Sequence, residues 1–353
     1  MLAIRTDGQA PFLDRSAPEP APGEGEALVR VIRCAVDATD VAAARGDYGF
    51  RGVLGRMFVG EVVEVSGGGV GGAGRGGAGR GGSGIGPGRR VVCGINVVDP
   101  RTELARRGLG IHDPQRRVIG LRGRDGCLAE RIAVPTLNLA PVPDGIDDER
   151  ACLAQAVADA VHASRMTRLE GKGFVTVLGD SPAALLCAQV MVRLNNTVRV
   201  IAPTDRRFAL CERWGVRHRL LGEIGLREDQ DVVIECTGTP EGVATALRLV
   251  RPRGKVVLKA DPLPVPGLPV ERGGGADLTP AVLNEVELLG ARDGSISEGL
   301  EALAWGAEAG RPSARHALDV EGLITARTRL ADGVACLRSA AEENALTVSV
   351  ACG

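Results

Sequence analysis

Six residues that follow an apolar run could form a turn that binds a dinucleotide. The run Phe174–Leu178 is predicted to be a buried strand, and the turn after it reads GDSPAA. In a parallel sheet, such a turn holds a pyrophosphate with backbone N–H groups and the positive end of the following helix. The usual pattern is G-x-G-x-x-G, of which Gly179 and a tolerated Ala184 remain. Ser181 replaces the second glycine and Asp180 adds a negative charge, so we predict an altered cofactor turn at these four positions.

The second part of such a site is an acidic residue about 20 residues further on, which binds the adenosine ribose. No acid stands at Ala202 or Pro203, where the second strand ends, and Asp205 is expected to cap the next helix. Arg206 and Arg207 follow, and two interpretations remain open for them. They could bind the 2′-phosphate of NADP, or they could lie in a solvated first turn of the helix. We therefore predict NAD or NADP as the cofactor, with a weak preference for NADP.

The composition excludes several classes of protein. The 353 residues carry 43 basic and 44 acidic side chains, so the formal net charge is −1 and no nucleic-acid partner is expected. No apolar run approaches the ~20 residues that a membrane-spanning helix needs, and residues 1–14 do not resemble a signal peptide. The nine cysteines are scattered and form no C-x-x-C pair. This pattern predicts free thiols and a cytoplasmic protein rather than a disulfide framework.

The elements that must position these residues change in character near residue 150, which predicts two domains. Residues 1–150 contain short strands separated by glycine and proline, as in a small β-rich domain. Residues 151–289 alternate strands and helices, which predicts an α/β domain with a doubly wound parallel sheet of the Rossmann type. Residues 66–88 hold 14 of the 50 glycines. We predict a flexible surface loop there rather than an RNA-binding tract, because no aromatic side chain is available to stack on a base.

Apolar patterning gives the expected bounds of the individual elements. Strands are expected at 27–36, 59–65, 89–98, 128–134, 174–178, 197–202, 231–236, 254–260 and 346–351. Helices are expected at 147–168, 181–194, 205–214, 240–250, 299–306 and 330–341. This arrangement would place the altered cofactor turn at the carboxyl edge of the parallel sheet, where nucleotides bind in this class of fold.

Several motifs resemble the medium-chain dehydrogenase/reductase family, in its zinc-dependent alcohol dehydrogenase branch. They are Val36–Asp40, Arg45–Tyr48, Val53–Val62, Gly88–Val92, Gly123–Glu130, Glu235–Gly238 and Arg251–Gly254. The resemblance covers nearly the whole chain and implies a GroES-like β-rich domain, completed by about 290–353, around a Rossmann domain at 151–289. It also implies that Thr237 contacts the cofactor, that a small molecule binds in the interdomain cleft, and that the protein could form a homodimer.

The same resemblance implies that the catalytic zinc ligands of the family are lost. The cysteine ligand position holds Asp37, the histidine position holds Arg56 and the glutamate after it is Met57. The last ligand position, usually a glutamate–proline step, holds Gln155. Zinc takes thiolate, imidazole or carboxylate ligands, and a permanently charged guanidinium would repel it. We therefore expect no zinc, and a shift of the first ligand to Cys34 would still leave Arg56 in place.

The structural zinc of the family is also expected to be absent. Its four cysteine positions match Asp99, Thr102, Ala105 and Asp113, with His112 beside the last of them. One histidine and two carboxylates could bind a metal weakly, but a solvated loop is the preferred interpretation. Because many relatives lack this second zinc, its loss says little about the chemistry.

In place of the catalytic zinc, we predict an ion pair between Arg56 and Asp37, with Asp40 nearby. Thr39 matches the hydroxyl that relays the proton in this family, and a buried, hydrogen-bonded threonine is the alternative interpretation. Thr39, Asp40 and Arg56 are therefore the candidate catalytic residues. Two functions remain open. The first is a metal-free NAD(P)(H)-dependent oxidoreductase, in which Arg56 could polarise a carbonyl. The second is a pseudoenzyme that keeps the fold for ligand binding or protein assembly.

Overall fold

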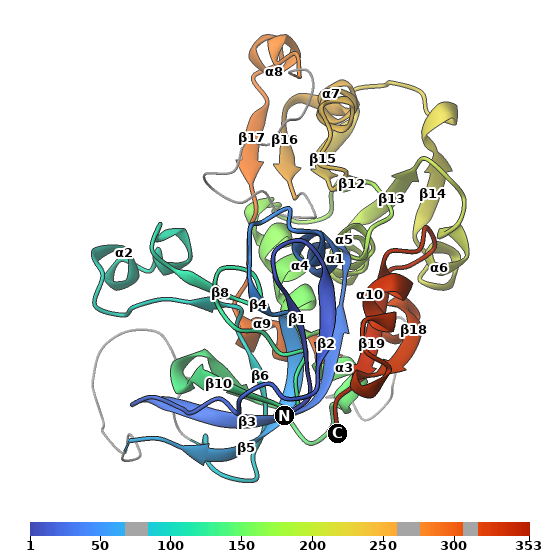
Figure 1. Ribbon diagram of the computed structural model, residues 1–353. Coiled ribbons are helices and arrows are strands. Elements are labelled where there is room, and N and C mark those ends of the chain that lie inside the picture. Colours follow the sequence, from blue (N-terminus) through green and yellow to red (C-terminus); the bar gives the residue numbers. More distant parts are fainter. Residues whose placement is uncertain (68–83, 260–275, 306–316) are drawn as a thin grey trace. The chain divides into compact units, whose positions relative to one another are not determined.

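The chain forms two compact units (Figure 1). The computed structural model describes residues 1–67, 84–259, 276–305 and 317–353. Unit 1 consists of Met1–Gln155 and Ile324–Gly353, and unit 2 consists of Ala156–Leu323. The loop predicted at 66–88 therefore lies mostly outside the described residues. No helix in the described part of the chain is both long and apolar enough to cross a membrane.

Unit 1 is built on a mostly antiparallel sheet in the order β11-β6-β5-β3-β19-β18, in which β10 also pairs with β3. Its strands are β3 Glu26–Val36, β5 Met57–Val65, β6 Arg90–Cys93, β10 Arg131–Pro135, β11 Leu139–Pro141, β18 Ile324–Arg329 and β19 Thr347–Ala351. Two three-stranded sheets join it, formed by β1 Ala3–Thr6, β2 Pro11–Asp14, β4 Gly52–Val53, β7 Asn96–Val97, β8 Arg117–Ile119 and β9 Gly123–Arg124. The helices of this unit are α1 Ala38–Arg45, α2 Glu103–Arg106, α3 Asp148–Ala151 and α10 Ala335–Ala340.

Strand β3 lies in the middle of the main sheet of unit 1. Its β-branched and small apolar residues suit a buried strand. Val29, Val31, Cys34 and Val36 are all fully buried in one hydrophobic cluster. The strand ends where Asp37 replaces the apolar pattern, and helix α1 begins one residue later. The core of unit 1 thereby fixes the start of the helix that carries two of the candidate catalytic residues, Thr39 and Asp40.

Unit 2 contains a six-stranded parallel sheet in the order β14-β13-β12-β15-β16-β17. The strands are β12 Phe174–Leu178, β13 Thr197–Ala202, β14 Arg217–Leu220, β15 Gln230–Glu235, β16 Val250–Leu258 and β17 Glu287–Gly290. The helices assigned to it are α4 Ala154–Met166, α5 Pro182–Arg193, α6 Phe208–Arg213, α7 Pro240–Leu249, α8 Thr279–Leu283 and α9 Ile296–Leu303. Helix α5 packs on β12 and β13, and α7 packs on β15 and β16. The strand order reverses between β12 and β15, as in a doubly wound nucleotide-binding sheet.

Unit 2 continues to Leu323, past residue 289, where the sequence pattern placed its end. The N–H of Asp319 donates to Gln189 Oε1 at 2.7 Å, and its carbonyl accepts from Gln189 Nε2 at 3.3 Å. The Trp214 indole donates to Asp319 Oδ2 at 2.8 Å. These bonds attach the segment around Asp319 to the end of α6 and to α5, so it belongs to unit 2.

Four helix predictions need correction. The helix expected at 205–214 begins only at Phe208. The single helix expected at 147–168 is divided into α3 and α4, which are separated at 152–153. The helix expected at 330–341 is a 3₁₀ turn at Leu330–Asp332 followed by the shorter α10. The helix expected at 299–306 begins earlier, at Ile296, and residue 306 lies outside the described residues.

Candidate functional site

The predicted cofactor turn lies where the strand order of unit 2 reverses. Gly179 follows β12 with φ at 109°, a conformation that favours glycine strongly. Its N–H donates to the carbonyl of Ile201 on β13 at 2.8 Å. Ser181 is the N-cap of α5, because its Oγ accepts from the N–H of Ala184 at 3.3 Å, and Pro182 opens the helix. The turn therefore presents the N-terminus of a 12-residue helix at the carboxyl edge of the sheet.

The hydroxyl of Ser181 has a structural use that the sequence interpretation missed. The motif comparison treats Ser181 only as a lost glycine, but Ser181 also precedes a proline, and a serine–proline step is a common start of a helix. Because the hydroxyl satisfies an N–H of the first helical turn, the replacement does not leave an unpaired polar group in the turn. The altered pattern is therefore compatible with a well-formed helix N-terminus.

Thr237 lies directly beside the cofactor turn. It follows Glu235 and Cys236 at the end of β15, the strand that pairs with β12. A Cβ atom at Gly179 would lie 3.5 Å from Thr237 Cγ2, so the two turns are in close contact. Thr237 is exposed, whereas Glu235 is buried. The structure thus brings Gly179, Ser181, Ala184 and Thr237 together at one end of the sheet.

The expectation that Asp205 caps α6 is wrong. The helix begins at Phe208, and Arg207 occupies the N-cap position, where its side chain does not cap the helix. Asp205 contributes only its backbone carbonyl there, which accepts from the N–H of Phe208 at 2.9 Å. Burial lowers the pKa of Arg207, while the negative charge of Asp180 acts to raise it. Arg206 is exposed.

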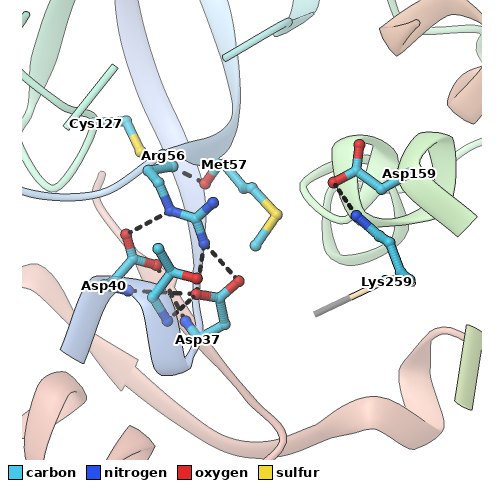
Figure 2. A network of polar contacts seen from close by, with 8 residues as sticks. Asp37, Asp40, Arg56, Met57, Cys127, Asp159 and Lys259 are labelled. Atoms are coloured by element: carbon cyan, nitrogen blue, oxygen red, sulfur yellow. Dashed lines mark hydrogen bonds and ion pairs between the residues drawn. The ribbon is translucent and has the colours of Figure 1, made fainter. Parts of the chain in front are cut away.

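Two of the candidate catalytic residues, Thr39 and Asp40, lie at the start of α1. Figure 2 shows Asp40 there, next to Asp37. Asp37 is the N-cap, and its Oδ1 accepts from the N–H of Thr39 at 2.9 Å and from the N–H of Asp40 at 3.4 Å. In return, Asp40 Oδ2 accepts from the N–H of Asp37 at 3.1 Å. This reciprocal arrangement is a capping box, which satisfies N–H groups that would otherwise be unpaired at the helix N-terminus.

Arg56 completes this cluster from the residue that precedes β5, and the ion pair expected from the sequence is present (Figure 2). Its Nη2 lies 2.6 Å from Asp37 Oδ1 and 2.7 Å from Asp37 Oδ2, and its Nε lies 3.3 Å from Asp40 Oδ1. Arg56 is only 5% exposed and Asp40 is fully buried. One guanidinium therefore holds two carboxylates in a place from which water is largely excluded.

The surroundings of Asp40 change its acidity. Burial raises the pKa of the Asp40 carboxyl from 3.8 to about 7, although the charge of Arg56 lowers it, and the charge of Asp37 raises it further. One cation cannot fully compensate two buried carboxylates, so the carboxyl with less access to water keeps its proton to higher pH. The cluster thus contains a buried group that changes charge near neutral pH.

The residues at the family's zinc-ligand positions do not fit a zinc ion. Asp37 is the only carboxylate, thiolate or imidazole among Asp37, Arg56 and Gln155, and the guanidinium of Arg56 spans both of its oxygens. The Cys34 thiol, the alternative ligand, donates to the carbonyl of Cys127 at 2.9 Å and lies 3.5 Å from Cys352 Sγ. Within the described ranges of the chain, no three or more His, Cys, Asp or Glu side chains form a group that could hold a metal ion.

The positions of the family's structural zinc serve local structure. Asp99 pairs with Arg101, whose Nη2 lies 2.9 Å from its Oδ2. Thr102 caps α2 by accepting from the N–H of Ala105 at 3.2 Å. Asp113 is buried, and its Oδ1 accepts from the N–H of Gln115 at 2.8 Å. Each of these groups has a partner within the loop itself.

Unit 2 contains a buried lysine, Lys259, near Asp159, which the sequence analysis does not single out (Figure 2). Lys259 follows β16 and is 3% exposed. Its Nζ donates to the carbonyl of Arg292 at 2.9 Å and lies 3.9 Å from Asp159 Oδ2 on α4. Asp159 Oδ1 accepts from the N–H of Gly294 at 2.9 Å. The lysine thereby connects α4 with the loop after β17, and a single lysine at the end of a strand carries no sequence signal for such a role.

Comparison with known proteins agrees with this fold. Residues 23–144 match the alcohol dehydrogenase GroES-like domain. L-threonine 3-dehydrogenase from Photorhabdus laumondii is 28% identical over 268 residues, which cover 69% of this chain and 72% of that protein. Among solved structures, a dehydrogenase from Sinorhizobium meliloti bound to NADP has a TM-score of 0.80 at 23% identity. The alcohol dehydrogenase of Thermus sp. ATN1 has a TM-score of 0.80 at 21% identity, and both alignments cover 99% of each chain.

A GroES-like β-rich domain together with a doubly wound parallel sheet defines a dehydrogenase-type oxidoreductase fold. The chain resembles the medium-chain dehydrogenase/reductase family, in its branch of zinc-dependent alcohol dehydrogenases, in the sequence of its GroES-like domain and in its whole fold. The predicted fold class, an α/β Rossmann sheet with a GroES-like β-rich domain, is confirmed.

Proposed function

We propose that this protein is a metal-free, NAD(P)(H)-dependent oxidoreductase that acts on a small molecule. The observation that carries the proposal is the position of the Gly179 turn. It lies at the switch point of the β14-β13-β12-β15-β16-β17 sheet, with the N-terminus of α5 directed to the same edge. Dinucleotides bind at this point in doubly wound sheets. The resemblance to medium-chain dehydrogenases/reductases supports the same cofactor class.

Each residue at the sheet edge has a proposed role in cofactor binding. Gly179, Ser181 and Ala184 would bring the backbone N–H groups of the turn to the pyrophosphate, and Thr237 would contact the second half of the dinucleotide. Arg206 is exposed, whereas Arg207 is partly buried and lies within reach of the Asp180 charge, so Arg206 is the better candidate for a 2′-phosphate. This supports the weak preference for NADP over NAD.

The proposed chemistry does not use a zinc ion. Arg56 and its two carboxylates take the place of a metal with its ligands, so no Lewis acid is assigned there. Because Nη2 and Nε of Arg56 are engaged by Asp37 and Asp40, we assign Arg56 and Asp40 a positioning role at the start of α1. The Thr39 hydroxyl remains the candidate that would exchange a proton with the substrate oxygen or carbon after hydride transfer.

A second candidate function is a pseudoenzyme that keeps this fold for binding or assembly. The observation that favours a pseudoenzyme is the pair of unusual residues, Asp180 and Ser181, in the turn after β12. Asp180 adds a carboxylate next to the proposed pyrophosphate position, and Ser181 places a side chain where the family uses glycine. A like charge beside a phosphate weakens binding, because the two anions repel each other.

Fluorescence titration with NADH and NADPH separates the two candidates. We expect saturable binding in the micromolar range, which is usual for enzyme ligands, and tighter binding of NADPH than of NADH. An Arg206→Ala variant should lose the preference for NADPH, while Arg217→Ala, an exposed arginine on β14, should retain it. If neither nucleotide binds, the oxidoreductase proposal fails and the pseudoenzyme remains.

Two further properties are proposed on the same basis. A homodimer is supported by exposed apolar residues near the edge strand β17, among them Leu278, Val282, Leu283 and Leu288. Sedimentation velocity at micromolar concentration would show a monomer if this is wrong. A cytoplasmic location is supported by the nine cysteines, which are all free thiols.

A further inference from the structure

The carboxylate of Glu235 binds the turn that follows its own strand. Glu235 is the last residue of β15 and is 1% exposed. Its Oε1 accepts from the N–H of Thr237 at 2.7 Å and from the Thr237 hydroxyl. The N–H of Gly238 donates to both oxygens, at 3.2 Å to Oε1 and 3.1 Å to Oε2. A buried carboxylate thus accepts from two successive backbone N–H groups and a hydroxyl.

This carboxylate fills an anion-binding position that is part of the fold. Successive N–H groups at a turn before a helix form a concave site for an anion. Here the turn precedes α7, and Thr239 caps that helix by accepting from the N–H of Gly242 at 3.0 Å. A Cβ at Gly242 would lie 2.5 Å from Glu235 Oε1, so the glycine leaves the space that the carboxylate occupies. The protein supplies its own anion to this turn.

The turn that Glu235 holds is one wall of the cofactor position. β15 pairs with β12, and the strand order reverses between them. The two turns touch, since a Cβ at Gly179 would lie 3.5 Å from both Thr237 Cγ2 and the carbonyl carbon of Cys236. In a doubly wound sheet, the adenosine half of a dinucleotide lies over the strands on the β13 side, and the second half lies over the β15 side. The Glu235 turn therefore faces the second half.

We propose that Glu235 is a positioning residue that fixes the Thr237–Gly238 turn for the nicotinamide half of the dinucleotide. This inference rests on the proposed function, because it requires that NAD(P)H binds to unit 2. Because Glu235 itself is buried, it would act through Thr237, whose N–H donates to its carboxylate. A pre-formed turn costs less free energy to order on binding, which increases affinity for the part of the ligand that touches it.

The test compares a whole dinucleotide with its adenosine half. Glu235→Gln keeps the size of the side chain but removes its charge and places an amide N–H₂ against N–H donors. We expect the Kd for NADPH to rise about 10- to 100-fold, the range for losing hydrogen bonds to a charged group. The Kd for adenosine 2′,5′-bisphosphate, which lacks the nicotinamide half, should stay unchanged. Glu241→Gln, in the first turn of α7, is the matched control and should bind both ligands as the natural protein does.

The outcomes separate this inference from the function on which it rests. If the natural protein binds neither NADPH nor NADH, both the proposed function and the inference are overturned. If it binds NADPH and Glu235→Gln binds NADPH equally well, only the inference is overturned. Equal weakening of NADPH and adenosine 2′,5′-bisphosphate also overturns it, because a general loss of structure would affect both halves.

A second pair of variants keeps the inference testable if Glu235→Gln does not fold. Thr237→Val removes the hydroxyl that donates to Glu235, and Thr237→Ser retains it. Thr237→Val should weaken NADPH binding more than Thr237→Ser does, with the affinity for adenosine 2′,5′-bisphosphate the same in both. Equal NADPH affinity of these two variants would overturn the role of Glu235.

Discussion

Arg56 determines the electrostatics at the residue positions where relatives of this protein are expected to bind zinc. A guanidinium with two hydrogen bonds to Asp37 and one to Asp40 is a strong, geometrically fixed partner. The attraction between these charges stabilises the fold, but removing the charged groups of Arg56, Asp37 and Asp40 from water costs free energy that offsets this gain. A buried pair of this kind therefore adds little net stability when complete, but removing one member leaves an uncompensated charge.

We predict that Arg56→Ala lowers the free energy of unfolding by about 3–5 kcal/mol, the range for breaking a buried ion pair. Adding Asp37→Asn to this variant should recover part of the loss. The amide removes the uncompensated charge, yet keeps an oxygen that accepts from the N–H groups of Thr39 and Asp40. Urea denaturation followed by circular dichroism would measure both changes.

Arg30→Ala serves as the matched control for Arg56→Ala. Arg30 pairs with Glu61 at 2.9 Å, but both side chains are well exposed, so the loss should be at most about 1 kcal/mol. A melting temperature of Arg56→Ala equal to that of the natural protein would contradict the structural role of the buried pair.

At the scale of elements, helix α1 contains a group whose charge depends on pH. The pKa of Asp40 is raised from 3.8 to about 7 by burial. At a pH between these two pKa values, Asp40 keeps its proton in the folded chain and has released it in the unfolded chain. Stability should therefore fall as pH rises from about 4 to about 7, by roughly 4 kcal/mol at most, and should be level above that range. Asp40→Asn should remove this slope, which denaturation at several pH values would measure.

Comparing Asp40→Asn with the natural protein at each pH cancels the titration of every other group. Asp47→Asn, an exposed aspartate just after the same helix, is the control and should leave the slope unchanged. The same stability difference between the natural protein and Asp40→Asn at about pH 5 and about pH 8 would mean that Asp40 stays ionised in the fold.

The elements that the sequence predicted well are those whose apolar pattern is long. β3, β12, β13, β15, α5 and α7 have bounds close to those expected, because buried strands and amphipathic helices leave clear periods in a sequence. Strand β14, with the sequence RHRL, alternates charged and less polar residues at the edge of the sheet and carries no such signal. Short edge strands of this kind depend on their neighbours rather than on their own residues.

The candidate site was predictable only in part, for a similar reason. The Arg56–Asp37 pair could be expected because family positions and opposite charges are both visible in the sequence. The capping box of Asp37 and Asp40, the cap formed by Ser181 and the Glu235 carboxylate depend on helix ends and turn geometry. These are fixed by tertiary packing to within one or two residues, which a single sequence does not specify.

At the scale of the whole molecule, the hydrophobic core of unit 1 is large enough to stabilise the fold without a bound metal. Its main cluster contains about thirty buried apolar residues from β3, β5, α10 and neighbouring segments, and small metal-dependent domains lack such a core. The loop that matches the family's structural zinc site is held by its own hydrogen bonds. Metal binding is therefore not expected to contribute to the folding free energy of this chain.

We predict that zinc supply changes neither the stability nor the nucleotide affinity of the purified protein. Protein produced with added zinc should contain far less than one zinc ion per chain, and a chelator should leave its melting temperature and its Kd for NADPH unchanged. A triple variant with Asp37→Cys, Arg56→His and Gln155→Glu is the matched control, because it restores a thiolate, an imidazole and a carboxylate to the ligand positions. That variant should take up zinc and lose stability when the metal is removed, since binding to the folded state alone stabilises it. Stoichiometric zinc in the natural protein, released by the chelator together with a fall in melting temperature, would contradict the replacement of the metal by Arg56.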